Sequence, residues 1–536
     1  MRALLVQGRS AQTYWSYDHS LPYIGKAAAL PPLGLITLAA LLPKSWDLRL
    51  VDLNAGALSA AELDWADVVL VSGMLAQADS MREVLARARR RGRRTVIGGP
   101  AATSAPGDFP DADHVFQGEA EGRLELLVRT LEAPGPDAPR LLSPEDSVRP
   151  PMSASPIPRF DLLGIPRYAS LSVQYSRGCP FHCEFCDIVE LFGHVPRVKS
   201  PDQVVAELDA LHRAGGRGSL FFVDDNFIGN RREVARLLPR IAAWQEANGR
   251  PFDLYTEASV DLAGEPALVE AMITAGFTGV FLGIETPSEE SLAAAGKRQN
   301  LRMDPATAVA RLTAAGFEVF AGFIIGFDTD GPDIFDRQIE FISRQPIPRA
   351  MIGLLNAAPN TALWRRLERE GRLRSTGLGD QFHRPNFEPA MDEAALLAGY
   401  RRVLAAVYSD EAYYRRCQLH IEQASIRSAP TSAPAFRALL RAIVGIGLLG
   451  PRRRHFWKLL ARSIARGPHA FVRAVTLAVL GEHVIRYTHE VVIPRLDGAM
   501  EEMSSRGPRR SSVPPGEAVP FAFAHPQVAA KVASEA

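Results

Sequence analysis

Short apolar runs alternate with amphipathic stretches along the first two thirds of the chain. In the first part, amphipathic stretches with helical spacing, among them 33–42, 77–91 and 122–131, separate the apolar runs. Near-continuous apolar strands alternating with helices are typical of a doubly wound parallel sheet, and we predict such a Rossmann-like α/β domain for residues 1–135. Its expected strands are Ala3–Val6, Leu48–Asp52, Val68–Ser72, Thr95–Ile97 and His114–Phe116.

A second series of apolar runs, again separated by helical patterns, follows a proline-rich connector over residues 136–168. Six strand–helix repeats predict a partial (β/α)6 barrel of the TIM type over residues 169–360, whose chemistry lies at the carboxyl ends of its strands. The expected strands are Ser172–Tyr175, Ser219–Val223, Asp253–Thr256, Thr278–Gly283, Phe317–Ile325 and Ala350–Leu355.

The remaining third of the chain has helical patterns without strands. We predict an α-helical region over residues 361–503 and a disordered tail over residues 504–536, where Ser, Pro and Arg dominate.

Composition changes this picture little. The 47% hydrophobic and 23% charged residues suit a globular core, and the net charge of +1 favours no class of partner. Four cysteines, three of them clustered, make no disulfide framework and suggest a reducing compartment, the cytoplasm. We expect neither a signal peptide nor a transmembrane helix, because the chain lacks the apolar runs that both require.

Three cysteines, Cys179, Cys183 and Cys186, occupy eight residues at spacings of three and two intervening residues. A thiolate triplet at this spacing can bind one face of an iron–sulfur cluster. With three thiolates, a four-iron cluster keeps one iron free for an exogenous ligand.

The alternative interpretation is a structural zinc site, with His182, Asp187 or His194 as the fourth ligand. Such sites usually pair two short cysteine knuckles, and no second knuckle occurs. Cys417 lies far along the chain in a helical stretch, and we expect it to be an inert thiol. We therefore favour the open cluster.

The CxxxCxxC motif, with the aromatic Phe185 before its last cysteine, resembles the signature of the radical SAM superfamily. The resemblance implies a 4Fe-4S cluster held by the three cysteines, with S-adenosylmethionine (SAM) at the open iron. In that family the reduced cluster cleaves SAM to a 5′-deoxyadenosyl radical, which abstracts hydrogen from an unreactive C–H bond. An external electron donor of the flavodoxin or ferredoxin type is implied as well.

Polar residues follow the predicted barrel strands at their carboxyl ends. SAM needs carboxylates or amides for its ammonium and ribose hydroxyls, and apolar surface for its adenine. The resemblance implies that Asp224, Asp225 or Asn226 contacts the methionyl ammonium, Glu257 and Ser259 the ribose or methionyl part, and Gly283 and Glu285 the ribose edge. The alternative for each acid is a helix cap or an ion pair at the barrel rim.

Small and turn-forming residues follow three strands of the N-terminal domain. Glycines there allow a ligand to approach the backbone closely, at the edge where open α/β sheets bind ligands. With the cysteine motif, this layout resembles the cobalamin-binding domain that precedes many radical SAM barrels. The resemblance implies cobalamin contacts from Ser72, Gly73, Gly98, Gly99, Gly118 and Glu119. The DxHxxG motif for a lower histidine ligand is absent, so we expect no protein histidine below the cobalt; the alternative is a degenerate domain that only packs on the barrel.

Further motifs, 221–230, 255–259, 283–287 and 322–328, are similar to the cobalamin-dependent radical SAM subgroup that contains the hopanoid C-2 methylases. The resemblance implies a C-methyltransferase acting on an unactivated carbon of a hydrophobic, lipid-like or natural-product substrate. Two alternatives remain. One is a non-methylating rearrangement or cyclisation with the same cofactors, and the other is a non-catalytic cobalamin or iron–sulfur sensor.

Residues 436–473 hold nine Lys or Arg and no Asp or Glu, next to the apolar run 442–450. This pattern suits either peripheral contact with the inner face of a membrane or an amphipathic helix with a solvated basic face; we favour the second slightly. Aromatic residues are too sparse among the basic ones for nucleic-acid binding, which we do not expect.

Overall fold

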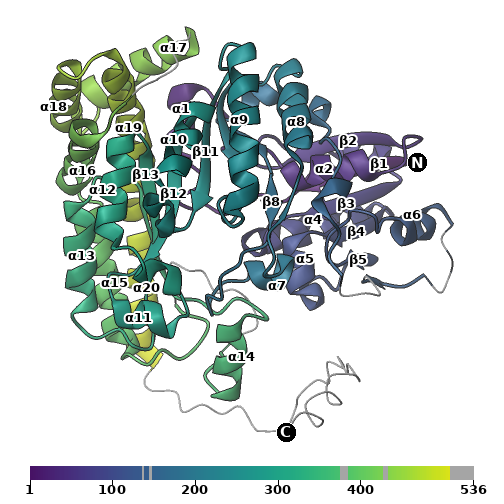
Figure 1. Ribbon diagram of the computed structural model, residues 1–536. Helices are drawn as coiled ribbons and strands as arrows, with labels where there is room; N and C mark the ends of the chain where they lie inside the picture. The colour runs from purple at the N-terminus through teal and green to yellow at the C-terminus, as the bar shows by residue number, and fades with distance from the viewer. Residues whose placement is uncertain (134, 136–137, 144–147, 375–383, 427–432, 507–536) are drawn as a thin grey trace, which may run out of the picture.

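The computed structural model describes residues 1–133, 135, 138–143, 148–374, 384–426 and 433–506 (Figure 1). An N-terminal α/β domain lies at the right of the view, a half-open barrel at the centre, and the C-terminal helices at the left. The expected tail lies outside the described residues from residue 507 onward, and residues 504–506 end a helix.

The N-terminal sheet has six parallel strands in the order β2-β1-β3-β4-β5-β6. The strand order reverses between β1 and β3, and such a switch point opens a ligand crevice at the carboxyl edge. The sheet continues past residue 135, because the edge strand β6 pairs with β5. The strands are β1 (Arg2–Gln7), β2 (Asp47–Asp52), β3 (Val68–Ser72), β4 (Arg94–Gly98), β5 (His114–Phe116) and β6 (Leu141–Leu142).

Helices cover both faces of this sheet, as the unbroken apolar strands predict. On one face, α2 (Leu33–Leu41) and α6 (Glu125–Glu132) bury leucines against the sheet. On the other face lie α3 (Ala60–Trp65), α4 (Ala78–Arg90) and α5 (Pro100–Ser104). The doubly wound fold is therefore confirmed.

The second sheet has six parallel strands in chain order, β7-β10-β11-β12-β13-β14, and curves into the predicted partial barrel. Its strands are β7 (Leu171–Val173), β10 (Gly218–Phe222), β11 (Phe252–Ala258), β12 (Phe277–Glu285), β13 (Glu318–Ile325) and β14 (Ala350–Leu354). Its outer helices are α8 (Pro201–Arg213), α9 (Arg231–Ala247), α10 (Pro266–Ala275), α12 (Pro305–Ala315) and α13 (Ile334–Arg344).

The C-terminal helices pack in two apolar clusters: the first helix lies in a cluster with Phe185 and Phe327, and the others share one continuous core with the barrel. They are α14 (Ala362–Arg369), α15 (Glu393–Val407), α16 (Asp410–Gln423), α17 (Ala433–Ala442), α18 (Arg453–Ile464), α19 (Pro468–Tyr487) and α20 (Ile493–Arg506). No helix in the described part of the chain combines the length and the apolar character needed to cross a membrane.

A buried ion cluster also joins this region to the barrel. Glu318 of β13 accepts hydrogen bonds from Arg349 at 2.7 Å and from Arg473 of α19. Burial alone would raise the pKa of Glu318, but the two guanidiniums outweigh it and lower the pKa to about 2.

The segment between β1 and α2 leaves the N-terminal domain and passes between the barrel and α19. The Tyr487 hydroxyl donates to the carbonyl of Gln12 at 2.7 Å, and the Ser20 hydroxyl donates to the carbonyl of Val479 at 2.7 Å. The Arg349 guanidinium donates to the Tyr17 hydroxyl at 2.9 Å. Residues 12–20 therefore connect all three parts of the molecule, which the sequence did not predict.

Candidate functional site

The three clustered cysteines lie on a loop carried by a small hairpin that follows β7. The hairpin pairs β8 (Ser176–Arg177) with β9 (Arg197–Val198) in antiparallel register. Gly178 opens the loop with a φ of +96°, and a Cβ there would stand 2.8 Å from the carbonyl oxygen of Gly193. Only glycine fits this position, because both the space and the backbone conformation exclude a side chain.

All three thiols are half-buried and free of disulfides. Burial raises the pKa of the Cys179 and Cys186 thiols. A metal centre would displace their protons, because the thiolate is the form that binds metals. Within the described residues, no group of three or more Cys, His, Asp or Glu converges closely enough to hold a single metal ion.

Two amides and one ammonium face these sulfurs. The Asn226 Nδ2 lies 3.9 Å from the Cys179 Sγ, and the Gln299 Nε2 lies 3.6 Å from the Cys183 Sγ. The charge of Lys297 is close enough to couple to Cys183 and Cys186. Hydrogen-bond donors around thiolates fit an anionic cluster and tune it. Lys297 and Gln299 carry no recognisable motif, and sequence reasoning missed both.

Asp224, predicted as a possible SAM contact, has another role here. Its buried carboxylate accepts from the backbone N–H groups of Tyr175, at 3.1 Å, and of Ser176, and also from the Ser176 hydroxyl. Both oxygens are occupied, so Asp224 holds the end of β10 to the chain leaving β7. Burial raises its pKa to about 6.

Asp225 and Glu257 differ from Asp224, because neither carboxyl group has a hydrogen-bond partner among the described side chains. Burial raises the pKa of Asp225 to about 7 and that of Glu257 to about 8, and the charge of Asp225 adds to the shift of Glu257. Asp225 also lies near Cys179 and Cys186. Two acids with raised pKa values beside the cysteine loop form a site that would favour a cationic group. The positive charge would stabilise both carboxylates and so lower their pKa values.

Asn226 and Ser259 lie together, as expected of neighbouring strand ends. The Asn226 Nδ2 is 3.3 Å from the Ser259 Oγ, and that hydroxyl donates to Asp261 at 2.5 Å. Asp261 in turn pairs with Arg231 of α9. The chain fixes the Asn226 amide, which therefore points at Cys179 in a defined orientation.

Glu285, for which a contact with the ribose edge is predicted, pairs with a lysine in this structure. Its backbone has a φ of +66° at a bulge in β12, and its carboxylate pairs with the buried Lys297. The pair lies directly against Gly283, where a Cβ would stand 2.5 Å from the Lys297 Nζ and 2.6 Å from the Glu285 Oε1. A side chain at position 283 would therefore displace this ion pair.

An apolar cavity of about 260 Å³ adjoins the cysteine loop at the carboxyl ends of β13 and β14. Phe185 of the loop forms one wall, and Tyr14 and Trp15 of the N-terminal segment form another. Trp15 also packs edge-on against Phe281 inside the barrel, with ring centroids 5.3 Å apart. The other lining residues are Phe323, Ile324, Met351, Ile352, Gly353, Leu354, Leu355 and Asn356.

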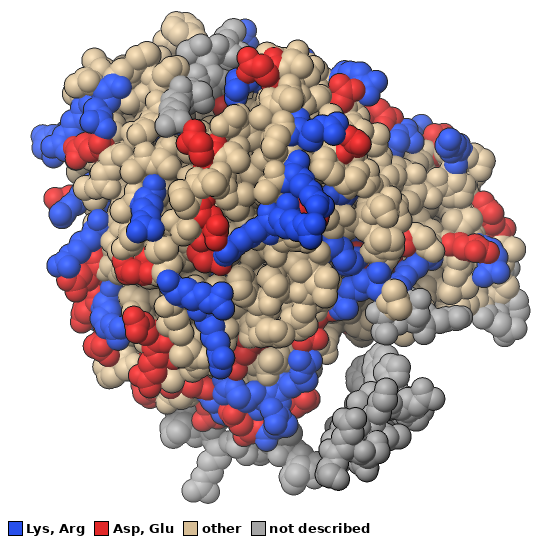
Figure 2. All heavy atoms as spheres, viewed as in Figure 1, with Lys and Arg blue, Asp and Glu red and all other residues tan. Residues whose placement is uncertain are grey.

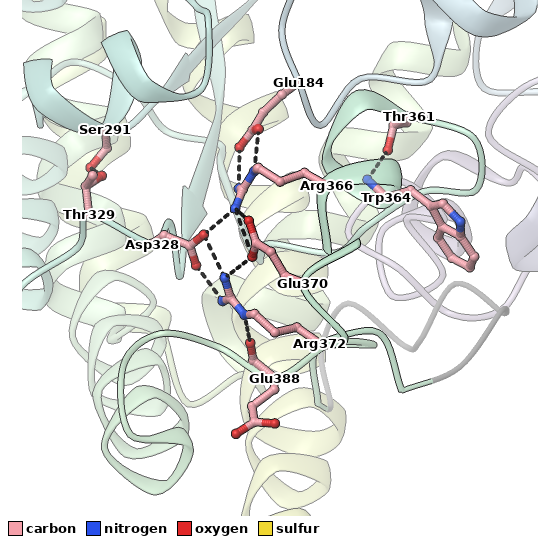
Figure 3. Close-up of polar contacts among 10 residues, drawn as sticks. All are labelled: Glu184, Ser291, Asp328, Thr329, Thr361, Trp364, Arg366, Glu370, Arg372 and Glu388. Carbon is pink, nitrogen blue, oxygen red and sulfur yellow. Dashed lines mark hydrogen bonds and ion pairs between the residues drawn. The ribbon is translucent and has the colours of Figure 1, made fainter. Parts of the chain in front are cut away.

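A polar network holds the cysteine loop against α14 (Figure 3). Arg366 lies between Glu184, at 2.9 Å, and Asp328, at 2.7 Å, and Arg372 contacts Asp328 at 2.6 Å. The amide N–H of Leu363 also donates to the Glu184 carbonyl at 2.8 Å. Glu184 of the cysteine loop is thus held in place by α14, the first helix after the barrel.

In the N-terminal domain, the predicted turn residues gather at the switch point of the sheet. Gly99 has a φ of +87°, and a Cβ there would stand 2.4 Å from the Ser72 Oγ. A Cβ on Gly73 would meet the Gln77 side chain at 2.7 Å, whereas Gly98 has ordinary space around it. The amide N–H of Gly118 donates to the Thr103 Oγ1 at 3.0 Å, next to α5. The bare backbone edge fits a large planar ligand such as a corrin.

No histidine of this domain lies at that edge. The domain has two: His19 reaches toward His483 of α19, and the His114 Nδ1 contacts the Pro139 carbonyl at 2.8 Å. The absence of a protein histidine below the cobalt stays a prediction.

Glu119 is not free to contact a cofactor in this structure. Its carboxylate pairs with Arg177 and Arg197 of the hairpin, each at 2.8 Å, and Glu121 pairs with Arg177 at 2.8 Å. All four side chains are largely buried. The predicted cofactor residue is therefore an interdomain contact that ties the switch-point loop to the hairpin carrying the cysteines.

A substitution at Gly99 tests the crevice. The ψ of Gly99 is −168°, so its backbone lies in a region that is essentially restricted to glycine; alanine there costs about 1–3 kcal/mol, and its Cβ collides with Ser72 as well. We expect Gly99→Ala to weaken hydroxocobalamin binding about ten-fold or more, measured by absorbance titration. Gly107→Ala, in the same domain with open space around the new Cβ, is the control and should bind normally. Equal affinities of the two variants for hydroxocobalamin would contradict the placement of the corrin at this strand edge.

Three family models match the chain, one over each of the three parts that the fold distinguishes. Residues 27–128 match the B12 binding domain, residues 173–342 the radical SAM superfamily, and residues 361–494 a domain of unknown function.

Two curated relatives are similar over nearly the whole chain. An uncharacterized methyltransferase of Synechocystis is 40% identical over 94% of this chain and 95% of its own length. The hopanoid C-2 methylase of Rhodopseudomonas palustris is 36% identical over 91% of this chain and 94% of its own length.

Two solved structures share the fold at low sequence identity. The radical SAM methyltransferase TsrM from Kitasatospora setae, with cobalamin and a [4Fe-4S] cluster bound, matches with a TM-score of 0.59 and 15% identity, over 87% of this chain and all of that one. The cobalamin-dependent SAM radical enzyme OxsB, with aqua-cobalamin and SAM bound, matches with a TM-score of 0.57 and 16% identity, over 94% of this chain and 83% of that one.

Proposed function

Since the chain belongs to the cobalamin-dependent radical SAM methyltransferase family that includes hopanoid C-2 methylase, we propose that it methylates an unactivated carbon of a hydrophobic, hopanoid-like lipid. The observation that carries the substrate class is the cavity between Phe185 and Trp15, whose lining side chains are mostly apolar. A charged substrate would lose its hydration there, because no charged side chain lines the cavity.

The family's cofactors are a 4Fe-4S cluster, SAM and cobalamin. When bound, they supply radical formation from SAM and a methyl group for a carbon that has no acidic proton. We propose that Cys179, Cys183 and Cys186 hold the cluster, and that the edge formed by Ser72, Gly73, Gly99 and Gly118 receives the corrin.

The remaining roles fall to the protein side chains. Asp225 and Glu257 would receive the methionyl ammonium, because each is a desolvated acid without a hydrogen-bond partner among the described side chains. Asn226 and Gln299 would donate to the cysteine sulfurs. Trp15, Phe185 and the ends of β13 and β14 would exclude water from the reacting carbon.

The reductant is proposed to come from outside the chain, from a protein of the flavodoxin or ferredoxin type. The half-buried cysteine loop has exposed neighbours, His182 and His194, whose rings stack 4.2 Å apart. Access to the loop from solvent is what an external electron donor requires.

The proposed reaction predicts one new methyl group per substrate. We expect the anaerobic, reduced enzyme with SAM, cobalamin and a hopanoid lipid to give a lipid heavier by one CH2, together with 5′-deoxyadenosine, both measured by mass spectrometry. A lipid changed without mass gain would indicate a rearrangement or cyclisation instead. The absence of deoxyadenosine from cofactor-loaded protein would contradict the enzyme assignment and favour a sensor.

A further inference from the structure

Exposed apolar side chains and exposed basic side chains lie together on α17, on α18 and on the π-helical segment between them, Ile443–Leu448. Seven large apolar side chains are exposed between Phe436 and Ile464, the two most exposed being Leu449 at 79% and Ile464 at 65%. Exposed apolar side chains gathered on one surface mark an interaction site rather than a solvated face. The others are Phe436, Leu440, Val444, Leu448 and Trp457.

These side chains form two stripes that meet. On α17 and the segment after it, Phe436, Leu440 and Val444 recur every four residues and so share one helix face. On α18, Trp457 and Ile464 are seven residues apart and share another. The stripes join because the Trp457 indole N–H donates to the Gly447 carbonyl at 2.9 Å.

Basic side chains flank both stripes. Arg437 adjoins the first, and Arg453, Arg454 and Lys458 adjoin the second; all four are exposed, and none pairs with a carboxylate among the described residues. The sequence has no Asp or Glu from Gln423 to Gly481, so no acid on these helices offsets the charge. Figure 2 shows Lys and Arg side chains gathered at the upper left, over α18.

Hydrogen bonds and an ion pair connect this surface to the rest of the molecule. The Arg441 guanidinium donates to the carbonyls of Pro22 and Tyr23 in α1 (Leu21–Ile24), at 3.2 and 3.4 Å. This helix belongs to the N-terminal segment that also supplies Trp15 to the apolar cavity. The buried Arg452 pairs with Glu482 of α19 at 3.0 Å, which anchors the start of α18.

We propose that this surface, formed by α17, the segment Ile443–Leu448 and α18, docks on an anionic lipid bilayer. Apolar side chains with a tryptophan enter the headgroup boundary, while the flanking cations face the lipid phosphates, as in interfacial amphipathic helices. A protein partner with an acidic rim would meet the same charges. The bilayer fits better, because an exposed tryptophan and exposed aliphatic side chains lie beside cations that have no carboxylate partner among the described residues. The inference stands independently of which substrate is methylated.

The test is flotation of the full-length chain with vesicles of phosphatidylcholine alone or mixed with phosphatidylglycerol. We expect binding to the anionic vesicles, weaker binding to the neutral ones, and a decline with salt. Each cation near an anionic surface contributes about five-fold to partitioning, so the double variant Arg453→Gln, Arg454→Gln should bind about 25-fold more weakly. The double variant Leu448→Ser, Leu449→Ser should lose binding to both kinds of vesicle.

Matched controls remove the same chemistry elsewhere. Arg236→Gln with Arg240→Gln removes two exposed cations of α9, and Val148→Ser removes an exposed apolar side chain of the connector. Both should bind like the unaltered chain, and thermal melting establishes that every variant is folded. No binding to anionic vesicles, or equal loss in controls and test variants, would overturn the proposal.

Discussion

Cys183→Ala is expected to abolish 5′-deoxyadenosine formation from SAM under strong reductant and to remove most of the bound iron. Cys183 is the middle cysteine of the triplet, and its sulfur accepts from the Gln299 amide at 3.6 Å. Two thiolates cannot hold a four-iron cluster on one face while leaving a single iron open. The measurements are iron analysis after anaerobic reconstitution and chromatography of the SAM cleavage products.

The control for this experiment is the fourth cysteine. Cys417 is fully buried in α16, far along the chain from the triplet, and burial raises its pKa to about 12. Cys417→Ala should therefore keep both iron and SAM cleavage. Retained cleavage in Cys183→Ala, or its loss in Cys417→Ala, would refute the assignment of the cluster ligands.

Arg177→Met is expected to lower the free energy of unfolding by about 3–5 kcal/mol, because it leaves two buried carboxylates without their shared cation. Arg177 is 13% exposed and pairs with Glu119 and Glu121, which are 6% and 4% exposed. It also precedes Cys179 by two residues, so the variant should bind less iron. Urea unfolding followed by circular dichroism, together with iron analysis, measures both effects.

Two further variants separate a buried interdomain contact from an ordinary surface pair. Arg236→Met breaks an exposed ion pair with Glu233 and should change stability by less than about 1 kcal/mol. Replacing Glu121 by glutamine in the Arg177→Met background should recover part of the loss, since Glu121 loses its pairing with Arg177 whereas Glu119 keeps that with Arg197. If Arg177→Met is no more destabilising than Arg236→Met, the hairpin does not depend on this contact.

Sequence patterns predicted the fold well because each part of it is encoded locally. Apolar runs such as Val68–Ser72 and helical spacing such as that of 77–91 are properties of neighbouring residues, and both elements occur where expected. The cysteine triplet and the glycines at 73 and 99 were also recognisable, because a short spacing or a bare backbone is a local requirement.

Side-chain partners were harder to predict, since they come from distant parts of the chain. The sequence did not predict that Glu119 pairs with Arg177 and Arg197, or that Glu285 pairs with Lys297. Asp224 and Asp225 are adjacent in sequence, yet one is fixed by backbone N–H groups and the other is left without a partner among the described side chains. Nothing local distinguishes these two acids.

The N-terminal segment was missed for the same reason. Tyr14 and Trp15 follow a strand of the first domain, and their positions depend on α19 and the barrel, more than 250 residues away. A pattern of hydrophobic and polar residues contains no information about such a connection. The apolar cavity, which depends on this segment, could therefore not be placed from the sequence.

The central claim is that one chain carries an open iron–sulfur cluster on its barrel and a corrin on its N-terminal domain. Metal analysis of the anaerobically reconstituted protein tests it most directly. The account predicts about four irons per chain, with the absorbance of a bound corrin. Protein that retains neither iron nor corrin after reconstitution, or that takes up zinc at the three cysteines in their place, would contradict it.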